Sequence, residues 1–247
     1  MQARHLPTIN PRYWTGIALA SIFGTNMGDF YAHEAGLGLL GGLPILIGLF
    51  LLVFIAERFD KLTHEAYYWL CIIIMRTGAT NIADYMAGRH GMHIDRLVLS
   101  LSFGAAIAVL ALWAYSAARA KNEHLTPKSM PDTDARYWVT MLLAGIFGTV
   151  LGDYFEKTIG ENLAALVLPL VLAGALLLYR QKVMSVILGY WLVVGVARTA
   201  GTAIGDWFAD NKAVGLPLST LCSGLVFVGV LVLWRTGKRQ DDPALAV

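Results

Sequence analysis

Four stretches of the chain run for 18 to 22 residues without a charged side chain. They are residues 37–56, 97–118, 162–179 and 213–234. A helix needs about 20 apolar residues to cross the hydrocarbon core of a bilayer. Only 15% of the residues are charged and 57% are hydrophobic, so the chain lacks the polar side chains that would cover a soluble fold of this size. The sequence therefore predicts an integral membrane protein.

Four further apolar segments are shorter or interrupted. Residues 13–28 and 137–152 each end at an aspartate, and residues 66–83 and 183–205 each contain one arginine. Backbone groups in hydrocarbon must be satisfied within their own segment, so we predict an all-α fold of eight transmembrane helices. Its expected parts are an N-terminal segment (1–12), a first membrane half (13–118), a linker (119–136), a second membrane half (137–234) and a tail (235–247).

The Lys and Arg residues are unequally distributed between the two ends of the expected helices. Of the nineteen, thirteen lie in segments on the side of the N-terminus, four lie on the opposite side, and Arg76 and Arg198 lie within helices. Loops rich in Lys and Arg stay in the cytoplasm, so the linker and both termini are expected there. The net charge is only +2, which argues against a nucleic-acid-binding protein.

A four-fold internal repeat is the most informative feature of the sequence. Each copy has a Tyr-Trp pair, fourteen residues, and then an aspartate followed by an aromatic residue. Each aspartate follows Gly or Ala and has a threonine four residues before it. The copies begin at Tyr13, Tyr68, Tyr137 and Tyr190; their threonines are Thr25, Thr80, Thr149 and Thr202, and their aspartates are Asp29, Asp84, Asp153 and Asp206. A repeat at this level indicates one structural unit used four times.

The copies alternate in kind. The first and third share the sequence Ile-Phe-Gly-Thr, whereas the second and fourth share Arg-Thr, at Arg76 and Arg198. This alternation indicates a two-helix unit that was doubled and then doubled again. Because each unit has an even number of helices, all repeats enter the membrane in the same direction and are parallel. We expect two pseudo-symmetric halves, in which the helices with the Tyr-Trp motif form an inner ring.

From Tyr13 to Trp234, the repeated Tyr-Trp and Asp motifs resemble those of a family of bacterial inner-membrane proteins. Proteins of that family are built from four tandem copies of a two-transmembrane-helix repeat of unknown function. The resemblance implies the eight-helix architecture and a location in the bacterial inner (plasma) membrane. It implies no particular biochemical activity.

The four aspartates are expected to share one depth in the membrane. Fifteen residues separate each Trp from its Asp, which corresponds to about 22 Å of helix. If the Tyr-Trp pairs lie at the cytoplasmic interface, where such side chains concentrate, the aspartates lie near the outer boundary of the hydrocarbon. Each threonine hydroxyl either donates to the carboxylate one turn away or bonds back to its own backbone. The carboxylates either cap helix ends or face the bundle interior and bind protons or a cation.

Arg76 and Arg198 need partners inside the membrane. A charged residue at the centre of a transmembrane helix costs about 2.5–3.5 kcal/mol on insertion scales. Each arginine lies eight residues before an aspartate of its own helix, and a rotation of 100° per residue leaves the two side chains about 80° apart. We therefore expect each guanidinium group to reach a carboxylate or helix-end carbonyls on a neighbouring helix. It either holds helices together or acts as a counter-charge to a substrate or proton.

The segments after the first two aspartates contain residue types that bind divalent ions. They are His33, Glu34, His90 and His93. The H-E-x-x-H spacing is absent, so these residues form only a weak candidate metal site. No histidine lies in the middle of an expected helix, which argues against haem held by paired histidines. No cofactor is predicted.

These features favour a small transporter that moves a cation or a proton-coupled solute through a bundle lined by the four aspartates. The alternative is a non-transporting membrane scaffold or sensor in which the Asp and Arg residues are structural. No phosphate-binding loop, nucleophile motif or nucleophile–base spacing is visible, so we do not expect an enzyme. The expected partners are the lipid bilayer and a small cation or proton, and no oligomeric state follows from the sequence.

Overall fold

The computed structural model describes residues 6–59, 65–88, 91–121, 126 and 131–241. These residues form eight α-helices, one short π-helical segment and no β-strand. The elements are α1 (Pro11–Asp29), η1 (Phe30–Glu34), α2 (Leu43–Phe59), α3 (Ala66–Ala87), α4 (Arg96–Ala120), α5 (Ala135–Ile159), α6 (Glu161–Arg180), α7 (Val186–Ala209) and α8 (Gly215–Asp241). The all-α fold predicted from the sequence is therefore confirmed.

The helices α1 and α5 begin with the same capping arrangement. The side chain of Asn10 accepts a hydrogen bond of 3.0 Å from the backbone N–H of Tyr13, and the side chain of Asp134 accepts one of 3.0 Å from the backbone N–H of Tyr137. Such caps satisfy donors that the first turn of a helix leaves free. Both caps lie three residues before a motif tyrosine, so the two tyrosines occupy the first turn of their helices.

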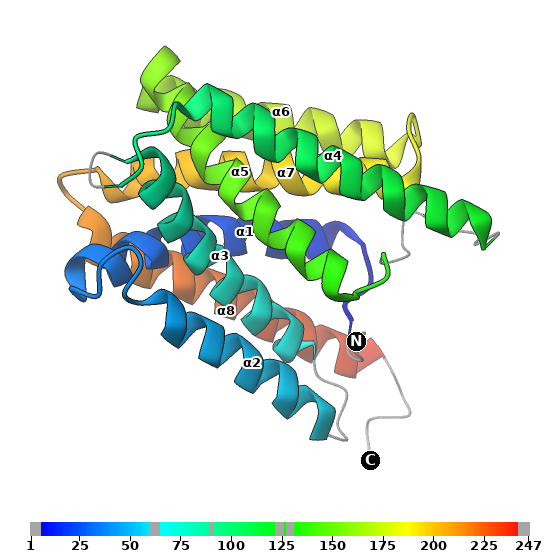
Figure 1. The fold of residues 1–247 in the computed structure, drawn as a ribbon. Helices are drawn as coiled ribbons and strands as arrows, with labels where there is room; N and C mark the ends of the chain where they lie inside the picture. The colour runs from blue at the N-terminus through cyan, green and yellow to red at the C-terminus, as the bar shows by residue number, and fades with distance from the viewer. Residues whose placement is uncertain (1–5, 60–64, 89–90, 122–125, 127–130, 242–247) are drawn as a thin grey trace.

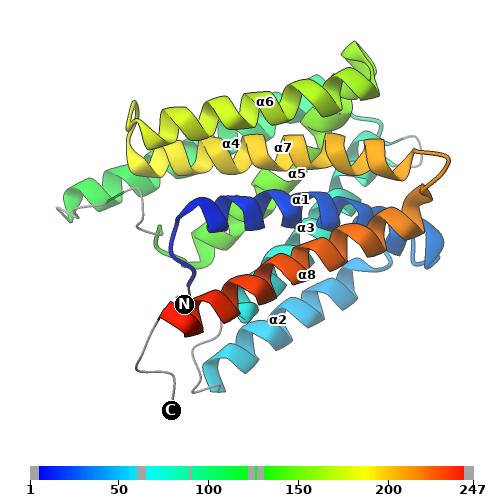
Figure 2. The ribbon, with the colours of Figure 1, turned by 180° about the vertical axis from the view of Figure 1, so that it is seen from behind.

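The helices α1, α3, α5 and α7 form an inner ring. In this ring α1 packs against α3 and α7, and α5 packs against the same two helices. Figure 1 shows the four inner helices between α2 and α8 on one side and α4 and α6 on the other, and Figure 2 shows the same order from behind. The odd-numbered helices thus form the inner ring that the repeat predicts.

Each outer helix covers the inner helix of the following repeat. The pairs are α2 on α3, α4 on α5, α6 on α7 and α8 on α1. The last helix thereby closes the circle on the first. Because the same step is repeated four times, equal positions in the four repeats lie at equal depth along the bundle.

Inner and outer helices differ in what they bury and what they expose. The inner helices bury polar groups, including Thr25, Arg76 and Arg198. The outer helices instead expose large apolar side chains such as Ile47, Leu52 and Leu166. A broad apolar surface of this kind is unfavourable in water and suits contact with lipid.

The sequence predicts eight transmembrane helices. Among the described residues, five helices are long and apolar enough to cross a membrane: α4, α5, α6, α7 and the part Gly215–Leu233 of α8. The helix α2 has only 17 residues, and both α1 and α3 contain polar side chains that they bury in the ring. The chain is therefore a multi-pass helical membrane protein.

Candidate ion site along the bundle axis

Polar residues of the four repeats meet in layers along the axis of the inner ring. The inner helices are parallel, so residues at the same position in each repeat form one layer. The layers, in order from the start of the helices, are the motif tyrosines, then Arg76 and Arg198 with Ser21 and Gly145, then the motif threonines, and then the motif aspartates. Successive layers from the arginines onward are four residues apart, which is about 6 Å along a helix.

The four motif tyrosines close the axis with a ring of hydrogen-bonded hydroxyl groups. The O···O distances are 2.8 Å for Tyr13–Tyr68, 2.7 Å for Tyr68–Tyr137, 2.8 Å for Tyr137–Tyr190 and 2.6 Å for Tyr13–Tyr190. Four hydroxyl groups in a closed ring can each donate one hydrogen bond and accept one. The ring therefore satisfies itself inside the bundle without water.

The motif tryptophans surround this tyrosine ring. Each tyrosine ring packs against the tryptophan of the next repeat, with centroid distances of 5.4 to 6.0 Å. The pairs are Tyr13–Trp69, Tyr68–Trp138, Tyr137–Trp191 and Tyr190–Trp14. All eight side chains are buried in the bundle, where they pack against one another. Their expected depth at the cytoplasmic interface stays a prediction.

Arg76 is the centre of the threonine layer. Its Nη1 donates hydrogen bonds to the hydroxyl oxygens of Thr80 (2.9 Å) and Thr149 (2.7 Å), and its Nη2 donates to those of Thr25 and Thr202. Nη1 also donates to the carbonyl oxygen of Gly145 at 3.4 Å. The motif threonines of all four repeats therefore hold one guanidinium group.

The threonine hydroxyl protons point back to their own helices. Thr25, Thr80 and Thr202 donate to the carbonyl oxygen four residues earlier. Their oxygen lone pairs remain available to accept from Arg76. Of the two sequence-based interpretations, back-bonding is confirmed for these three residues. In the described part of the chain, no hydrogen bond joins a motif threonine to a motif aspartate.

Arg198 lies in the same layer as Arg76 but turns the other way. Its Nη1 donates to the hydroxyl oxygen of Ser21 at 3.2 Å, and its Nη2 donates to the sulfur of Met141 at 3.3 Å. Met141 lies closer to the tyrosine ring by one helical turn. Among the described residues, the Nε atoms of Arg198 and of Arg76 both lack a hydrogen-bond partner.

The expected pairing of Arg76 and Arg198 with carboxylates is wrong for the described residues. Both side chains are 1% exposed, and within the described ranges no ion pair joins either one to an aspartate or glutamate. Arg76 does reach a carbonyl of a neighbouring helix, but this is Gly145 in the middle of α5 and not one of the helix-end carbonyls that the sequence predicts. Neutral hydroxyl groups of the threonine layer take the place that the carboxylates were expected to fill.

Small residues allow the inner helices to approach closely at these layers. A Cβ atom at Gly24 would overlap the side chain of Arg76, and one at Gly148 would overlap the side chain of Arg198. One turn further, Cβ atoms at Gly28 and Gly152 would each lie 2.8 Å from the Cβ of Thr80 and Thr202, respectively. The contacts of α1 with α3 therefore match those of α5 with α7. Close approach of this kind is typical of small residues in membrane helices.

The four motif aspartates line one cavity of about 400 Å³ at the end of the axis opposite the tyrosine ring. All four side chains are half-buried. Thr25, Thr80 and Thr149 also line the cavity, so it ends at the layer that holds Arg76. The other ionisable residues of its lining are His33, Glu156, Lys157 and Asp210. The structure thus brings together the candidate site residues of all four repeats.

Asp153 differs from the other three motif aspartates because it has a cationic partner. The Nε of Arg96, at the start of α4, lies 3.2 Å from its Oδ2. On its other side, one carboxylate oxygen each from Asp153, Glu156 and Asp206 lie within 4.8 Å of one another. This pair could not be predicted from the sequence, because Arg96 and Asp153 lie on two different helices and no sequence motif links them.

The residues predicted as weak metal ligands do not gather at one point in the described structure. His33 lines the aspartate cavity, Glu34 and His93 are exposed, and His90 lies outside the described residues. Among the residues described, the group of metal-binding types that lie close together is Asp153, Glu156 and Asp206 instead. A metal site formed by His33, Glu34, His90 and His93 stays a prediction.

Comparison with known proteins supports the repeat found in the sequence. The model of a family described as Repeat of Unknown Function (DUF347) matches residues 12–61 and 189–240. The first match contains α2 and all but the first residue of α1, and the second contains most of α7 and most of α8. No curated protein and no solved structure shows a significant similarity to the chain. The resemblance to a family of repeats of unknown function is confirmed for residues 12–61 and 189–240, which are similar to that repeat.

Proposed function

We propose that this protein is a small transporter for protons or a small cation, and that the aspartate cavity is its ion-binding site. The observation that carries the proposal is that the motif aspartates of all four repeats line the same cavity. Its lining contains six carboxyl side chains and one lysine. A cleft lined by charges of one sign concentrates ions of the opposite sign, and acidic residues inside membrane bundles typically mark ion or proton paths.

Two polar layers separate this cavity from the other end of the axis. The first is the guanidinium group of Arg76 with its four threonines, and the second is the tyrosine ring. Among the described residues, no ion pair joins Arg76 or Arg198 to a motif aspartate, so Arg–Asp pairs do not hold the core together. An ion site that is open at one end and closed by hydrogen-bonded layers at the other is compatible with alternating access.

In an alternating-access transport cycle, Arg76 is suited to act as a cation that is tethered to the protein. Its guanidinium group lies next to the aspartate cavity and is held by neutral oxygens alone. A cation bound in the cavity repels this group, whereas an empty, ionised cavity attracts it. We propose that Arg76 moves toward the aspartates when the cation leaves and returns to the threonines when a cation binds.

The proposed topology has eight transmembrane helices, with α1 to α4 and α5 to α8 as two pseudo-symmetric halves. The matching glycine contacts in the pairs α1–α3 and α5–α7 support the two halves. The excess of Lys and Arg on the side of the termini supports cytoplasmic termini, and we propose the bacterial inner membrane as the location. The aspartate cavity then opens to the outer side.

The test is an ion-flux assay on the purified protein in liposomes, across pH and with several monovalent and divalent cations. We expect a pH-dependent flux that Asp84→Asn and Asp206→Asn abolish while expression and folding stay unchanged. The matched control is Asp95→Asn, because Asp95 caps α4 outside the cavity and Asn is an equally good cap. Wild-type protein that carries no ion, or Asn variants with full and equally pH-dependent flux, would refute the proposal.

A second candidate function is a non-transporting scaffold or sensor. The closed tyrosine ring favours it, because self-satisfied hydrogen bonds on the axis stabilise one fixed arrangement. The two functions differ in what Tyr137→Phe and Tyr190→Phe do. Opening the ring should alter the flux of a transporter, whereas in a scaffold it should change only the unfolding temperature. We propose no enzymatic role.

A further inference from the structure

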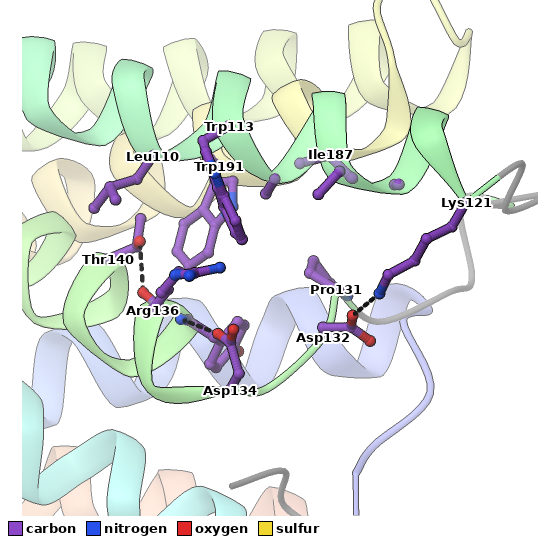
Figure 3. A pocket seen from close by; sticks show the side chains of 14 residues that line it. Leu110, Trp113, Lys121, Pro131, Asp132, Asp134, Arg136, Thr140, Ile187 and Trp191 are labelled. Carbon is purple, nitrogen blue, oxygen red and sulfur yellow. Dashed lines mark hydrogen bonds and ion pairs between the residues drawn. The ribbon is translucent and has the colours of Figure 1, made fainter.

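A second cavity lies at the end of the bundle that holds the tyrosine ring. It has a volume of about 340 Å³ and lies between the end of α4, the start of α5 and the start of α7 (Figure 3). The lining includes Tyr137 of the tyrosine ring and Trp191, one of the motif tryptophans that surround the ring. We call it the α4–α5–α7 cavity. Its size is in the range of cavities that bind small molecules.

The charged groups of this cavity comprise two cations and two carboxylates. Lys121 and Arg136 supply the cations, and Asp132 and Asp134 supply the carboxylates. The Nζ of Lys121 lies 3.3 Å from Oδ2 of Asp132, and Figure 3 shows this pair on one side of the cavity. Both side chains of the pair are more than half exposed, so the pair is weak and easily exchanged for other partners.

Arg136 is held against an aromatic ring. Its guanidinium carbon lies 3.6 Å from the ring centroid of Trp113, which is 45% exposed. A guanidinium group stacked in this way keeps its N–H groups free to donate in its own plane. The planar donor set of Arg matches the oxygens of a phosphate. Arg136 therefore presents a pre-oriented phosphate-binding group to the cavity.

The wall of the cavity on α4 continues into an exposed apolar surface. Leu110, Trp113 and Ala114 line the cavity, and the nearby Val109 and Leu112 are 65% and 52% exposed. Tryptophan is enriched where hydrocarbon meets the polar head groups of a bilayer. A molecule that fills this cavity with its polar part can lay its apolar part along α4.

We propose that the α4–α5–α7 cavity binds a phospholipid whose head group carries both a phosphate and a primary ammonium, as in phosphatidylethanolamine. Arg136 and Lys121 bind the phosphate, and Asp132 and Asp134 accept hydrogen bonds from the ammonium. The balanced charge of the lining excludes a preference for a purely anionic head group. A trimethylammonium group has no N–H to donate, and the face of Trp113 that it would need is covered by Arg136.

A lipid bound there would connect the membrane surface to the bundle axis. Its head group would contact α4, α5 and α7 together with Tyr137 of the tyrosine ring. The proposal does not depend on transport, because it follows from the lining of this cavity alone. It can therefore succeed or fail independently of the proposed function.

The experiment measures lipid binding to the delipidated full-length protein in detergent by native mass spectrometry. The probes are short-chain phosphatidylethanolamine, phosphatidylglycerol and phosphatidylcholine, with phosphoethanolamine and inorganic phosphate as free head-group controls. We expect phosphatidylethanolamine to bind about tenfold more tightly than the other two lipids, and free phosphate to compete only weakly. Arg136→Gln should weaken this binding about tenfold, because Gln lacks the charge and the planar donor set.

Two matched variants complete the test. Asp132→Asn should remove the preference for phosphatidylethanolamine over phosphatidylglycerol. Arg180→Gln removes an exposed arginine at the end of α6 that does not line the cavity, and it should leave binding unchanged. Equal affinity for all three lipids, unchanged binding by Arg136→Gln, or inorganic phosphate that binds as tightly as the lipid would each overturn the proposal. The unfolding temperature of Arg136→Gln shows whether the variant is folded. If it is folded, weaker lipid binding results from the loss of the guanidinium group.

Discussion

Arg76 and Arg198 hold the same position in the second and fourth repeats, but their guanidinium groups turn toward opposite ends of the bundle. Arg76 extends to the threonine layer and receives four hydroxyl oxygens. Arg198 turns toward the tyrosine ring and meets one hydroxyl group and one thioether. The two arginines therefore have the same Arg-Thr motif but different environments. The residues that surround each guanidinium group, and not the motif, make the difference.

The direction of Arg198 is the one that a helix favours by itself. Side chains on a helix lean toward its N-terminus, which is the direction of the tyrosine ring. Arg76 points against this tendency, and its four threonine partners compensate for it. With Arg76 in place, each of the four hydroxyl groups already accepts one hydrogen bond, so a second guanidinium group in that layer would have to share the same oxygens. Repulsion between two like charges at short range also favours opposite directions.

The largest expected effect comes from removing Arg76. Arg76→Ala should lower the free energy of unfolding by about 3 kcal/mol, because it removes a buried group with several hydrogen bonds and leaves a void between four helices. Arg76→Lys should restore only part of this loss, because an ammonium group cannot reach four oxygens in a plane. The measurement is denaturant or thermal unfolding in detergent. An Ala variant as stable as wild type would mean that the threonine layer does not need its arginine.

Substitutions of the glycines beside the two arginines should lower the free energy of unfolding by different amounts. A Cβ at Gly148 would lie 2.7 Å from the backbone carbonyl carbon of Arg198, whereas the nearest backbone atom to a Cβ at Gly24 is 3.7 Å away. Gly148→Ala must therefore displace α7 itself, and we expect a loss of about 2 kcal/mol. A Cβ at Gly24 would overlap the Cγ of Arg76 and lie 2.7 Å from its Cβ, so Gly24→Ala must also displace the start of that side chain. Because the nearest backbone atom is farther away than at Gly148, it should cost less than Gly148→Ala.

The control for the glycine variants is Gly174→Ala in α6, where no atom lies within 4 Å of the added Cβ. This substitution should stabilise the protein by up to about 1 kcal/mol, because Ala favours a helix more than Gly does. If Gly24→Ala proves more harmful than Gly148→Ala, the position of the Arg76 side chain is more rigid than that of the α7 backbone.

Arg198→Met should have a smaller effect than Arg76→Ala. Arg198 is a buried charge with two weak partners, whereas Arg76 donates to four hydroxyl oxygens. An apolar residue of similar length often replaces a buried ionic group without loss. We expect a change of about 1 kcal/mol or less in the free energy of unfolding. A loss as large as that of Arg76→Ala would show that Arg198 has a stronger interaction than its two hydrogen bonds, such as one with the tyrosine ring.

The two arginines also show which features can be predicted from the sequence alone and which cannot. Uncharged stretches and the four-fold repeat predict the eight helices, the inner ring and the common depth of the aspartates. The rotation of 100° per residue correctly separates Arg76 from Asp84, but it does not identify the neighbour that each arginine meets. Arg76 and Arg198 have the same local motif, so their opposite directions depend on which residue occupies the shared threonine layer.

The tyrosines show a second limit of the sequence. Their composition suggests an interfacial belt, which is the usual place for Tyr and Trp in a membrane protein. What composition does not predict is that their hydroxyl groups bond to one another in a closed ring in the bundle. The signal that points to the ring is the register: one tyrosine per repeat, on parallel helices, at one depth. Four polar groups placed in that way around one axis are close enough to bond to each other.

The smallest expected effect concerns Arg96, which pairs with Asp153 at the rim of the aspartate cavity. Here the side chains of Arg96 and Asp153 are 21% and 18% exposed, whereas Arg76 is almost fully buried. Ion pairs near the surface contribute about 0–1 kcal/mol, so Arg96→Gln should lower the free energy of unfolding by about 0.5 kcal/mol. Salt screens such a pair, and the loss should therefore disappear at about 0.5 M salt.

The same change in ionic strength should leave the loss from Arg76→Ala intact. The partners of Arg76 are neutral oxygens and its side chain is almost fully buried, so we expect its contribution to arise from hydrogen bonds and packing, which salt does not screen. Unfolding of the wild type and both variants in detergent, each at low and high salt, tests this difference. If salt removes the effect of Arg76→Ala, ions reach the threonine layer. The aspartate cavity then extends in solution along the bundle axis as far as Arg76. If salt leaves the effect of Arg96→Gln unchanged, the rim pair is buried as deeply as the axis, and Asp153 is less available than the other three aspartates to bind a cation.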